Sequence, residues 1–465
     1  MQQLILAADW QVKARDPAHT LIDDFSTTSG WLPAAVPGVV HQDLLAAGAI
    51  PDPFYGCNET AVQWVGERDW LYRCTFTVAP ELLLEEALDL CFDGLDTFAT
   101  VWLNGQEILQ SDNMFVPQRV RVKEELQPGM NELHLLFSAA FQRGQALEAE
   151  HGKLHVWNGD ASRVYVRKAQ YHYGWDWGPT LLTAGPWRAI RLEAYRARIA
   201  DLHCPSEVTE DLQRATIRVA VMVDGAGRSG CPVQIALTDP AGLLLETVTV
   251  TPTANRADHT FTLAKPALWW PAGYGDQPLY RVTATLVADG VDLDQLAVRV
   301  GLRRLALVQE PVTGEAGTSF YFALNNTPIF CGGVNWIPAD SFTPRITAEK
   351  YRALLQLVAD ANLVMVRVWG GGIYEEECFY DSCDELGLLV WQDFLFACGL
   401  YPRMMRFRQA CGRRPRPTCG GCAAIRRLCS GVATMRIMRW PNRSNAMTPP
   451  SPPISPTALP GACHL

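Results

Sequence analysis

Residues with the chemistry of sugar binding follow three apolar runs in the second half of the 465-residue chain. Asn335 and Trp336 end the first run. Arg367 and Trp369 end the second, and Asp393 follows the third. Flat aromatic rings pack on the C–H surfaces of a sugar, and fixed polar groups bind its hydroxyls. These residues predict a carbohydrate site, although aromatic residues at strand ends more often serve packing and Arg367 could instead pair with a buried carboxylate.

The elements that must position these residues alternate between strands and helices. The predicted strands lie within 320–340 (a hairpin and then a strand), 363–370 and 388–394, and the predicted helices are 347–362 and 375–387. Strand–helix–strand order implies parallel pairing, and the strand ends of a (β/α)8 barrel form one rigid face. Residues 305–402 therefore predict the N-terminal part of a TIM-barrel domain, an incomplete one because a whole barrel takes about 250 residues.

The two preceding regions predict β-sandwiches, so the fold class is multidomain and mainly β. Residues 1–195 contain short apolar runs separated by turn signals such as Asn104-Gly105, with few helical stretches, which predicts a jelly roll. Residues 196–304 contain strands at regular spacing, which predicts a separate immunoglobulin-like sandwich.

The motifs of this chain resemble those of the β-mannosidases of glycoside hydrolase family 2. In chain order they are DGLDTFATVWLNG (93–105), QYHYGWDWGPTLLTAGPWR (170–188), LWWPAGYGDQPLY (268–280), GVNWIPAD (333–340), RVWGGGIYE (367–375) and WQDF (391–394). GWDWGP is the most specific, because it marks the mannosidase branch of the family. The resemblance covers residues 1 to about 402, and it implies that the first sandwich is a galactose-binding-like domain.

The resemblance also implies an activity, which is hydrolysis of terminal non-reducing β-D-mannose residues from β-mannoside oligosaccharides with retention. One glutamate would protonate the leaving oxygen while a second attacks the anomeric carbon, and no metal or organic cofactor is implied. A loop of the first domain would reach over the barrel mouth to the terminal mannose. The implied substrate-binding residues are Trp175, Asp176, Trp369, Asn335, Trp336, Arg367 and Asp393.

The composition changes abruptly after about residue 402. Residues 401–465 contain eleven arginines and no lysine, aspartate or glutamate. The resemblance places the acid/base glutamate in a run similar to LWCGNNE, about where Thr434 and Met435 stand, and no such run is present. Read from the third base of each codon, residues 430–436 can spell WCGNNE. We therefore expect residues 403–465 to be out of frame and disordered.

The expected consequence is a truncated chain in which no catalytic residue is intact. The acid/base glutamate would lie in another frame near Thr434-Met435, and the nucleophile would lie beyond the C-terminus, so we expect the chain to be inactive. A non-catalytic carbohydrate-binding fragment is the alternative. Two further functions of the tail remain open, namely nucleic-acid binding through its arginines and a zinc site at Cys419 and Cys422, but a second ligand pair is missing, and we expect neither.

The compartment is the last expectation from the sequence. No stretch approaches the ~20 apolar residues that cross a bilayer. The segment MQQLILAADWQVKARD has neither a basic region nor a small-residue cleavage site. We therefore expect a cytoplasmic protein without a membrane partner.

Overall fold

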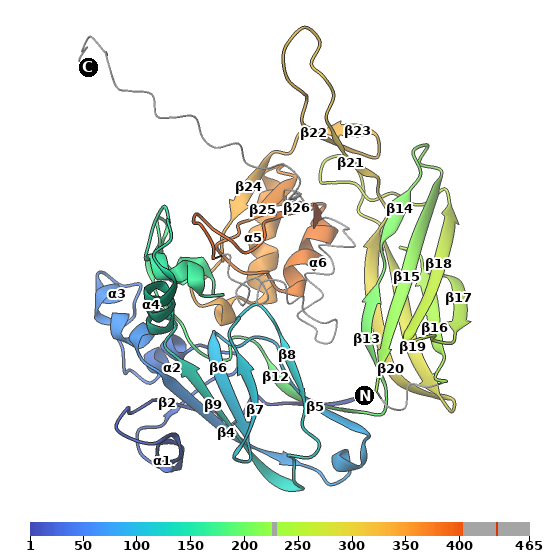
Figure 1. Ribbon diagram of the computed structural model, residues 1–465. Coiled ribbons are helices and arrows are strands. Elements are labelled where there is room, and N and C mark those ends of the chain that lie inside the picture. Colours follow the sequence, from blue (N-terminus) through green and yellow to red (C-terminus); the bar gives the residue numbers. More distant parts are fainter. Residues whose placement is uncertain (226–229, 403–433, 436–465) are drawn as a thin grey trace, which may run out of the picture.

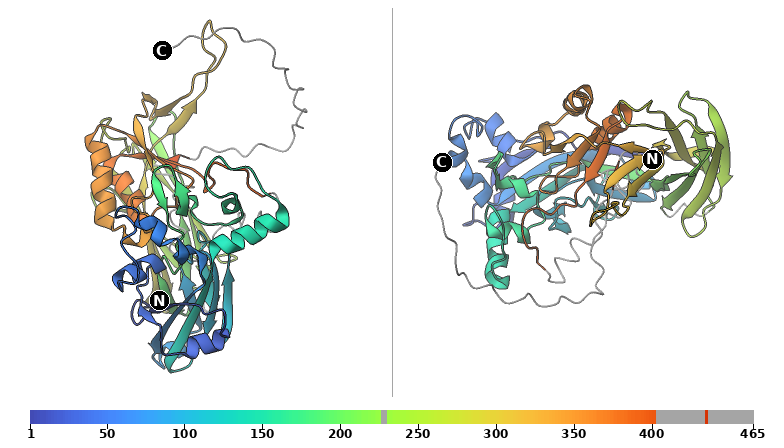
Figure 2. Two further views of the ribbon diagram at one scale, coloured as in Figure 1. Left: turned by 90° about the vertical axis from the view of Figure 1, so that its left-hand side faces the viewer. Right: turned by 90° about the horizontal axis from the view of Figure 1, so that it is seen from above.

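The computed structural model describes residues 1–225, 230–402 and 434–435 (Figure 1), and this part of the chain contains three large hydrophobic cores and one small one. Apart from Thr434 and Met435, the segment expected to be out of frame lies outside the described residues. In Figure 1 and the right-hand view of Figure 2, strands β24 to β26 (orange) lie between a first sandwich (blue to green) and a second one (green to yellow).

The first sandwich consists of two antiparallel sheets, with strand orders β3-β2-β4-β9-β6-β7 and β1-β12-β5-β8. Buried and exposed residues alternate along β9, so one face of the larger sheet packs on the core and the other faces outward. The strands are β1 (Gln2–Ile5), β2 (Gln11–Ala14), β3 (Leu32–Pro33), β4 (Trp70–Val78), β5 (Ala87–Phe92), β6 (Phe98–Leu103), β7 (Gln106–Ser111), β8 (Gln118–Arg121), β9 (Gly129–Ser138) and β12 (Ile190–Tyr195).

The first sandwich also carries helices and a hairpin, and the hairpin lies on the side of the parallel strands. The α-helices are α1 (Leu21–Ser26), α2 (Val40–Ala46), α3 (Asn58–Ala61) and α4 (Ala140–His151), and the hairpin is β10 (Tyr173–Trp175) with β11 (Gly178–Thr180). The 3-10 helices are η1 (Gln63–Glu67), η2 (Leu82–Leu84), η3 (Ala161–Tyr165) and η4 (Gln170–His172). Helix α4 was not predicted, because its sequence has few apolar residues and contains Gly144. Packing of Ala140 near Val166 and Tyr173 stabilises it instead.

The second sandwich also consists of two antiparallel sheets. Its strands are β13 (Arg198–His203), β14 (Ser206–Val208), β15 (Arg214–Asp224), β16 (Val233–Thr238), β17 (Leu244–Val250), β18 (Arg256–Ala264), β19 (Leu279–Ala288) and β20 (Val291–Gly301). One sheet has the order β13-β15-β14 with β18 also on β15, and the other has the order β17-β16-β19-β20. This is the immunoglobulin-like architecture expected for this region, with a core of its own.

The parallel sheet follows a small antiparallel one. The antiparallel strands are β21 (Leu305–Val308), β22 (Tyr321–Leu324) and β23 (Thr327–Ile329), and the parallel strands are β24 (Gly333–Trp336), β25 (Met365–Val368), β26 (Leu389–Gln392) and β27 (Thr434–Met435). The connecting elements are η6 (Thr343–Arg345), α5 (Ala348–Asp360) and α6 (Glu377–Leu386). Thr347 caps the start of α5 through Lys350 N, and Gly387 ends α6 in the left-handed conformation. Strands and helices alternate as they do at the start of a (β/α)8 barrel.

None of the helices in these described ranges has the length and apolar character needed to cross a membrane.

Candidate substrate-binding site

The parallel strands bring one row of the expected side chains together. Asn335, Arg367 and Trp391 are neighbours in register across β24, β25 and β26. The Arg367 guanidinium donates to Asn335 Oδ1 at 3.1 Å and to Asp393 Oδ2 at 2.7 Å. Arg367 remains 43% exposed while its partner Asp393 is buried. The guanidinium therefore pairs with a carboxylate and still presents an accessible edge to a ligand.

The carboxylate of Asp393 has several donors around it. Besides Arg367, the backbone N–H of Gly370 donates to Oδ2 at 3.2 Å and the indole N–H of Trp391 donates to Oδ1 at 3.1 Å. Together these hydrogen bonds fix the position of the carboxylate. Asp393 is therefore suited to hold Arg367 and Trp391 in place.

A tryptophan cluster joins the first sandwich to the strand ends. The ring of Trp369, directly after β25, lies 4.7 Å from that of Trp175 and 5.9 Å from that of Trp177, edge to face in both cases. Trp175 ends β10, and Asp176 and Trp177 form the turn of the β10–β11 hairpin. Asp176 is exposed and Trp175 is half-buried. The hairpin therefore reaches the strand ends, as expected, with an aromatic surface and an exposed carboxylate at its tip.

The three consecutive glycines after Trp369 allow this close approach. A Cβ on Gly371 would lie 1.9 Å from the Trp369 ring, and one on Gly370 would lie 2.5 Å from Phe394 O. The carbonyl of Gly371 accepts a hydrogen bond from Tyr171 N at 3.1 Å. The glycine run is thus a backbone contact between the barrel strands and the first sandwich, which any side chain would obstruct.

Two buried arginines of the first sandwich hold the segment that follows β26. Arg163 donates to the carbonyls of Ala397 at 2.9 Å and Cys398 at 2.7 Å, and its guanidinium lies 5.2 Å from the Trp175 ring centre. Arg167 donates to the carbonyl of Leu395 at 2.9 Å. The sequence did not reveal these residues, because their partners lie more than two hundred positions away. Their only signal was the unusual placement of arginines in an apolar stretch just before the GWDWGP motif.

A fully buried polar cluster lies beside the β10–β11 hairpin. Lys168 forms an ion pair with Asp96 and donates to the carbonyl of Thr183 at 2.9 Å. The hydroxyl of Thr183 donates to Asp96 Oδ2 at 2.6 Å and lies 3.4 Å from the ring nitrogens of His172. Burial lowers the pKa of Lys168, whereas Asp96 opposes that shift. Burial also holds the pKa of His172 well below its usual range, so this imidazole is neutral.

Trp336 is not part of the row with Asn335. Neighbouring residues of a strand point to opposite faces, and Trp336 faces the helices, where its ring lies 4.9 Å from that of Phe379. Its indole N–H donates to Glu375 Oε1 at 3.0 Å, and Tyr351 donates to Oε2 of the same carboxylate. Burial raises the pKa of Glu375 to about 7, against the effect of these donors. The geometry thus gives Trp336 a packing position on the helical layer.

Glu375 also lines a cavity between the barrel strands and the first sandwich. The cavity measures about 420 Å³, and Arg188 from the first sandwich is one of its lining residues. Arg188 forms an ion pair with Glu376 at 2.7 Å and donates to Tyr374 O at 3.0 Å. The sequence predicted a helix from residue 375, but α6 begins at Glu377, and Glu375 is a buried acceptor that precedes it.

The place expected for the missing glutamate coincides with a described strand. Thr434 and Met435 form β27, which pairs in parallel with Val390 and Trp391 of β26. It is the fourth strand of this sheet. The described residues contain no group of three or more His, Cys, Asp or Glu side chains that could hold a metal ion.

Comparison with known proteins agrees with this architecture. The family model described as glycosyl hydrolase 2 galactose-binding domain-like matches residues 10–188, and that described as glycosyl hydrolases family 2 matches residues 197–303. β-Mannosidase B of Thermothelomyces thermophilus is 51% identical over 377 residues, which are 80% of this chain and 44% of that protein. β-Mannosidase B of Aspergillus clavatus is 43% identical over 408 residues, 86% of this chain and 47% of that protein.

A solved structure gives the same result in three dimensions. The crystal structure of the β-D-mannosidase from Dictyoglomus thermophilum superposes with a TM-score of 0.82 and 37% identity, and the match covers 93% of this chain and 51% of that one. The chain belongs to glycosyl hydrolase family 2. The relatives named here are β-mannosidases, and the chain spans about half their length.

Proposed function

We propose that the protein recognises the terminal non-reducing β-D-mannose residue of an oligosaccharide. We further propose that the reaction catalysed by proteins of this family type is hydrolysis of that residue with retention. The observation that carries this proposal is the contact between Trp175 and Trp369, beside the exposed edge of Arg367. Aromatic faces supply packing surfaces for the sugar ring, and Arg367, Asn335 and Asp176 supply donors and acceptors for its hydroxyls.

The described residues include the groups that we propose to bind the sugar, but they do not include the two catalytic carboxyl groups. Retaining hydrolysis requires two carboxyl groups about 5–5.5 Å apart, one as acid/base and one as nucleophile. Two buried carboxylates near the ends of the parallel strands have structural partners, because Asp393 binds Arg367 and Glu375 binds Tyr351 and Trp336. We therefore propose that the 465-residue chain binds β-mannosides and does not hydrolyse them.

The test uses the purified full chain, verified by mass spectrometry. Incubation with p-nitrophenyl β-mannoside should release no nitrophenol above background, whereas calorimetric titration with mannose should show binding. Trp175→Ala should abolish that binding. Tyr274→Ala, which removes an exposed aromatic ring from a loop of the second sandwich, is the matched control and should leave it unchanged. Clear turnover would contradict the absence of a catalytic pair, and failure of mannose to bind would contradict the recognition site.

We also propose a cytoplasmic location. The part of the chain that the structure describes contains nine cysteines and no disulfide, as is usual in a reducing compartment. Alkylation of the denatured, unreduced chain followed by mass spectrometry should modify every one of these nine thiols. Protection of a pair of them would contradict the proposal.

A further inference from the structure

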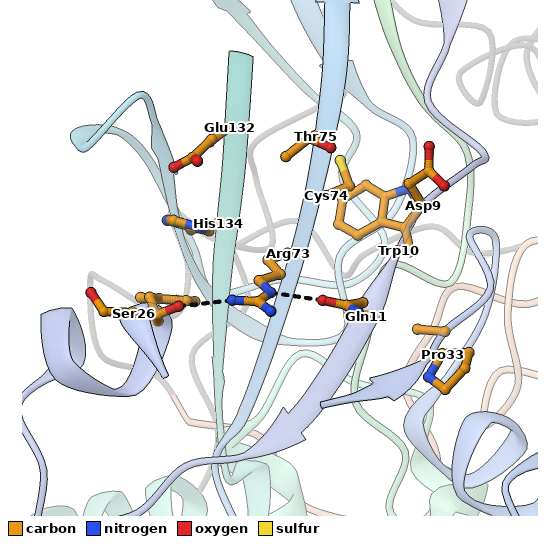
Figure 3. A pocket seen from close by; sticks show the side chains of 12 residues that line it. Asp9, Trp10, Gln11, Ser26, Pro33, Arg73, Cys74, Thr75, Glu132 and His134 are labelled. Carbon is orange, nitrogen blue, oxygen red and sulfur yellow. Dashed lines mark hydrogen bonds between the residues drawn. The ribbon is translucent and has the colours of Figure 1, made fainter. Parts of the chain in front are cut away.

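A second cavity opens on the outer face of the six-stranded sheet, and it shares no residue with the site described above. It measures about 890 Å³, within the range of small-molecule sites (Figure 3). Its lining residues are Asp9, Trp10, Gln11, Phe25, Ser26, Pro33, Ala34, Arg73, Cys74, Thr75, Glu132 and His134. They come from β2, β4 and β9, from the end of α1, and from the segments at residues 9–10 and 33–34.

The floor of this cavity is a set of polar side chains in register. Arg73 on β4 has Gln11 on β2 and His134 on β9 as its neighbours, and Thr75 has Glu132. Because alternate residues of a strand share a face, all five lie on the outer face of the sheet. Such a face is ordinarily a flat, solvated surface. Here α1 and the segments at residues 9–10 and 33–34 project above this face, so the polar groups line a cavity.

Arg73 is held rigidly at the centre of the cavity. Its Nε donates to Gln11 Oε1 at 2.9 Å, as a dashed line in Figure 3 shows, and its Nη1 donates to Phe25 O at 2.9 Å. The guanidinium lies 4.1 Å from the ring centre of Trp31, and Phe25 stacks on His134 at 4.3 Å. Its Nη2 donates to none of the described residues. One donor edge therefore points into the cavity with its orientation already fixed, which lowers the entropy cost of binding a ligand.

The remaining polar groups favour a ligand that is rich in donors. Among the described residues, the carboxylates of Asp9 and Glu132 accept no hydrogen bond and form no ion pair, and the hydroxyl of Thr75 has no protein partner. Burial lowers the pKa of His134, so the imidazole is neutral near pH 7. Two carboxylates and one guanidinium leave the cavity with a net negative charge, which disfavours phosphates and other anions.

We propose that this cavity is a second saccharide-binding site, for a neutral oligosaccharide whose hydroxyls donate to Asp9 and Glu132 and accept from Arg73. Neutral sugars carry hydroxyls that both donate and accept, so they satisfy this mixture of groups without placing an anion beside two carboxylates. The site lies on the first sandwich alone. It does not rest on the mannose site at Trp175, and either could exist without the other.

The test measures binding of neutral trisaccharides of mannose, glucose and xylose to the full chain carrying Trp175→Ala, so that the hairpin site does not contribute. Saturation-transfer NMR should detect at least one of them. Adding Thr75→Tyr fills the cavity and should weaken that binding by about tenfold or more, because the ring occupies the space of the ligand.

Thr77→Tyr is the matched control, because Thr77 is exposed on the same face of β4 but lies outside the cavity. It should change the affinity by less than about twofold, since tyrosine suits an exposed strand position as well as threonine does. Both variants should keep the melting temperature of their parent. Absence of binding for all three trisaccharides, or equal effects of the two tyrosine variants, would overturn the proposal.

Discussion

The two sandwiches contact different parts of the region that contains the parallel strands and their helices. The first inserts buried arginines, and Arg163 and Arg167 donate to backbone carbonyls in the segment just after β26. The second contacts the helical layer, where Arg299 forms half-exposed ion pairs with Asp381 and Glu385 on α6. Trp269 adds a buried hydrogen bond to Asp384 O at 2.8 Å.

The first sandwich therefore contacts the proposed ligand site, whereas the second contacts the helical layer behind that site. The segments that follow parallel strands form the binding face of a barrel, and the helices lie on its outside. Arg163 holds such a segment, whereas Arg299 holds a helix. We therefore expect changes at the first interface to affect both stability and sugar binding, and changes at the second to affect stability alone, and weakly.

The largest expected effect comes from Arg163→Ala. The substitution removes three hydrogen bonds, to Gln170 Oε1 and to the carbonyls of Ala397 and Cys398, and opens a cavity, so the free energy of unfolding should fall by about 4 kcal/mol. Denaturant unfolding followed by circular dichroism measures the loss, and calorimetry should show that mannose binding is lost with it. A loss of less than about 1 kcal/mol would mean that the buried contacts contribute no more than surface ones.

The next effect is a pH dependence at the first interface. Burial raises the pKa of Glu375 from 4.5 to about 7, so between these values the folded chain keeps a proton that the unfolded chain has released. The contribution of this group to stability is therefore complete below pH 4.5 and is lost as the pH rises through 7, by about 3 kcal/mol at 1.36 kcal/mol per pKa unit.

Glu375→Gln should remove this slope from a plot of unfolding free energy against pH. Glu315→Gln changes an exposed loop residue and is the matched control, for which the slope should persist. An unchanged slope in Glu375→Gln would show that the group titrates at its ordinary value in the folded chain.

A smaller effect is expected from Gly371→Ala. The new methyl group would lie 1.9 Å from the Trp369 ring, so the ring must move away from Trp175 at a cost of about 2 kcal/mol. Mannose affinity should fall with it, by about tenfold for 1.4 kcal/mol of lost contact. Gly332→Ala is the control, because its methyl group would meet nothing closer than 3.4 Å. Equal melting temperatures for the two variants would contradict the close approach.

The smallest effect belongs to the second interface. Arg299→Ala removes two half-exposed ion pairs and should cost less than about 1 kcal/mol, a loss that shrinks further in high salt. Mannose binding should be unaffected. A loss comparable to that of Arg163→Ala, or a change in mannose affinity, would remove the distinction between the two sandwiches.

Much of the fold could be predicted from local patterns. Apolar positions of helical spacing in residues 347–362 correspond to α5, which buries Tyr351, Leu355 and Val358. The alternation of strands and helices gave the parallel pairing of β24 to β26. Helix α4 was missed because neighbouring elements, rather than its own residues, stabilise it.

The candidate site was predictable only in part. The sequence singled out Trp175, Trp369, Arg367 and Asp393, and the structure brings them to one face. It also singled out Asn335 and Trp336 together, although adjacent strand residues point to opposite sides. Which of the two faces the helices depends on the packing of α5 and α6, and the sequence of β24 does not contain that information.

The sequence by itself determined the family, the order of the elements and the motifs at the strand ends, because these depend on residues close together in the chain. Only the tertiary structure placed Arg163 against Cys398, 235 positions away, and Trp175 against Trp369. It likewise decided that Glu375 is buried and that Arg73 lies at the centre of a hollow. Burial and long-range contact are properties of the packed chain, since a polar residue shows its partner and its exposure only after distant segments have come together.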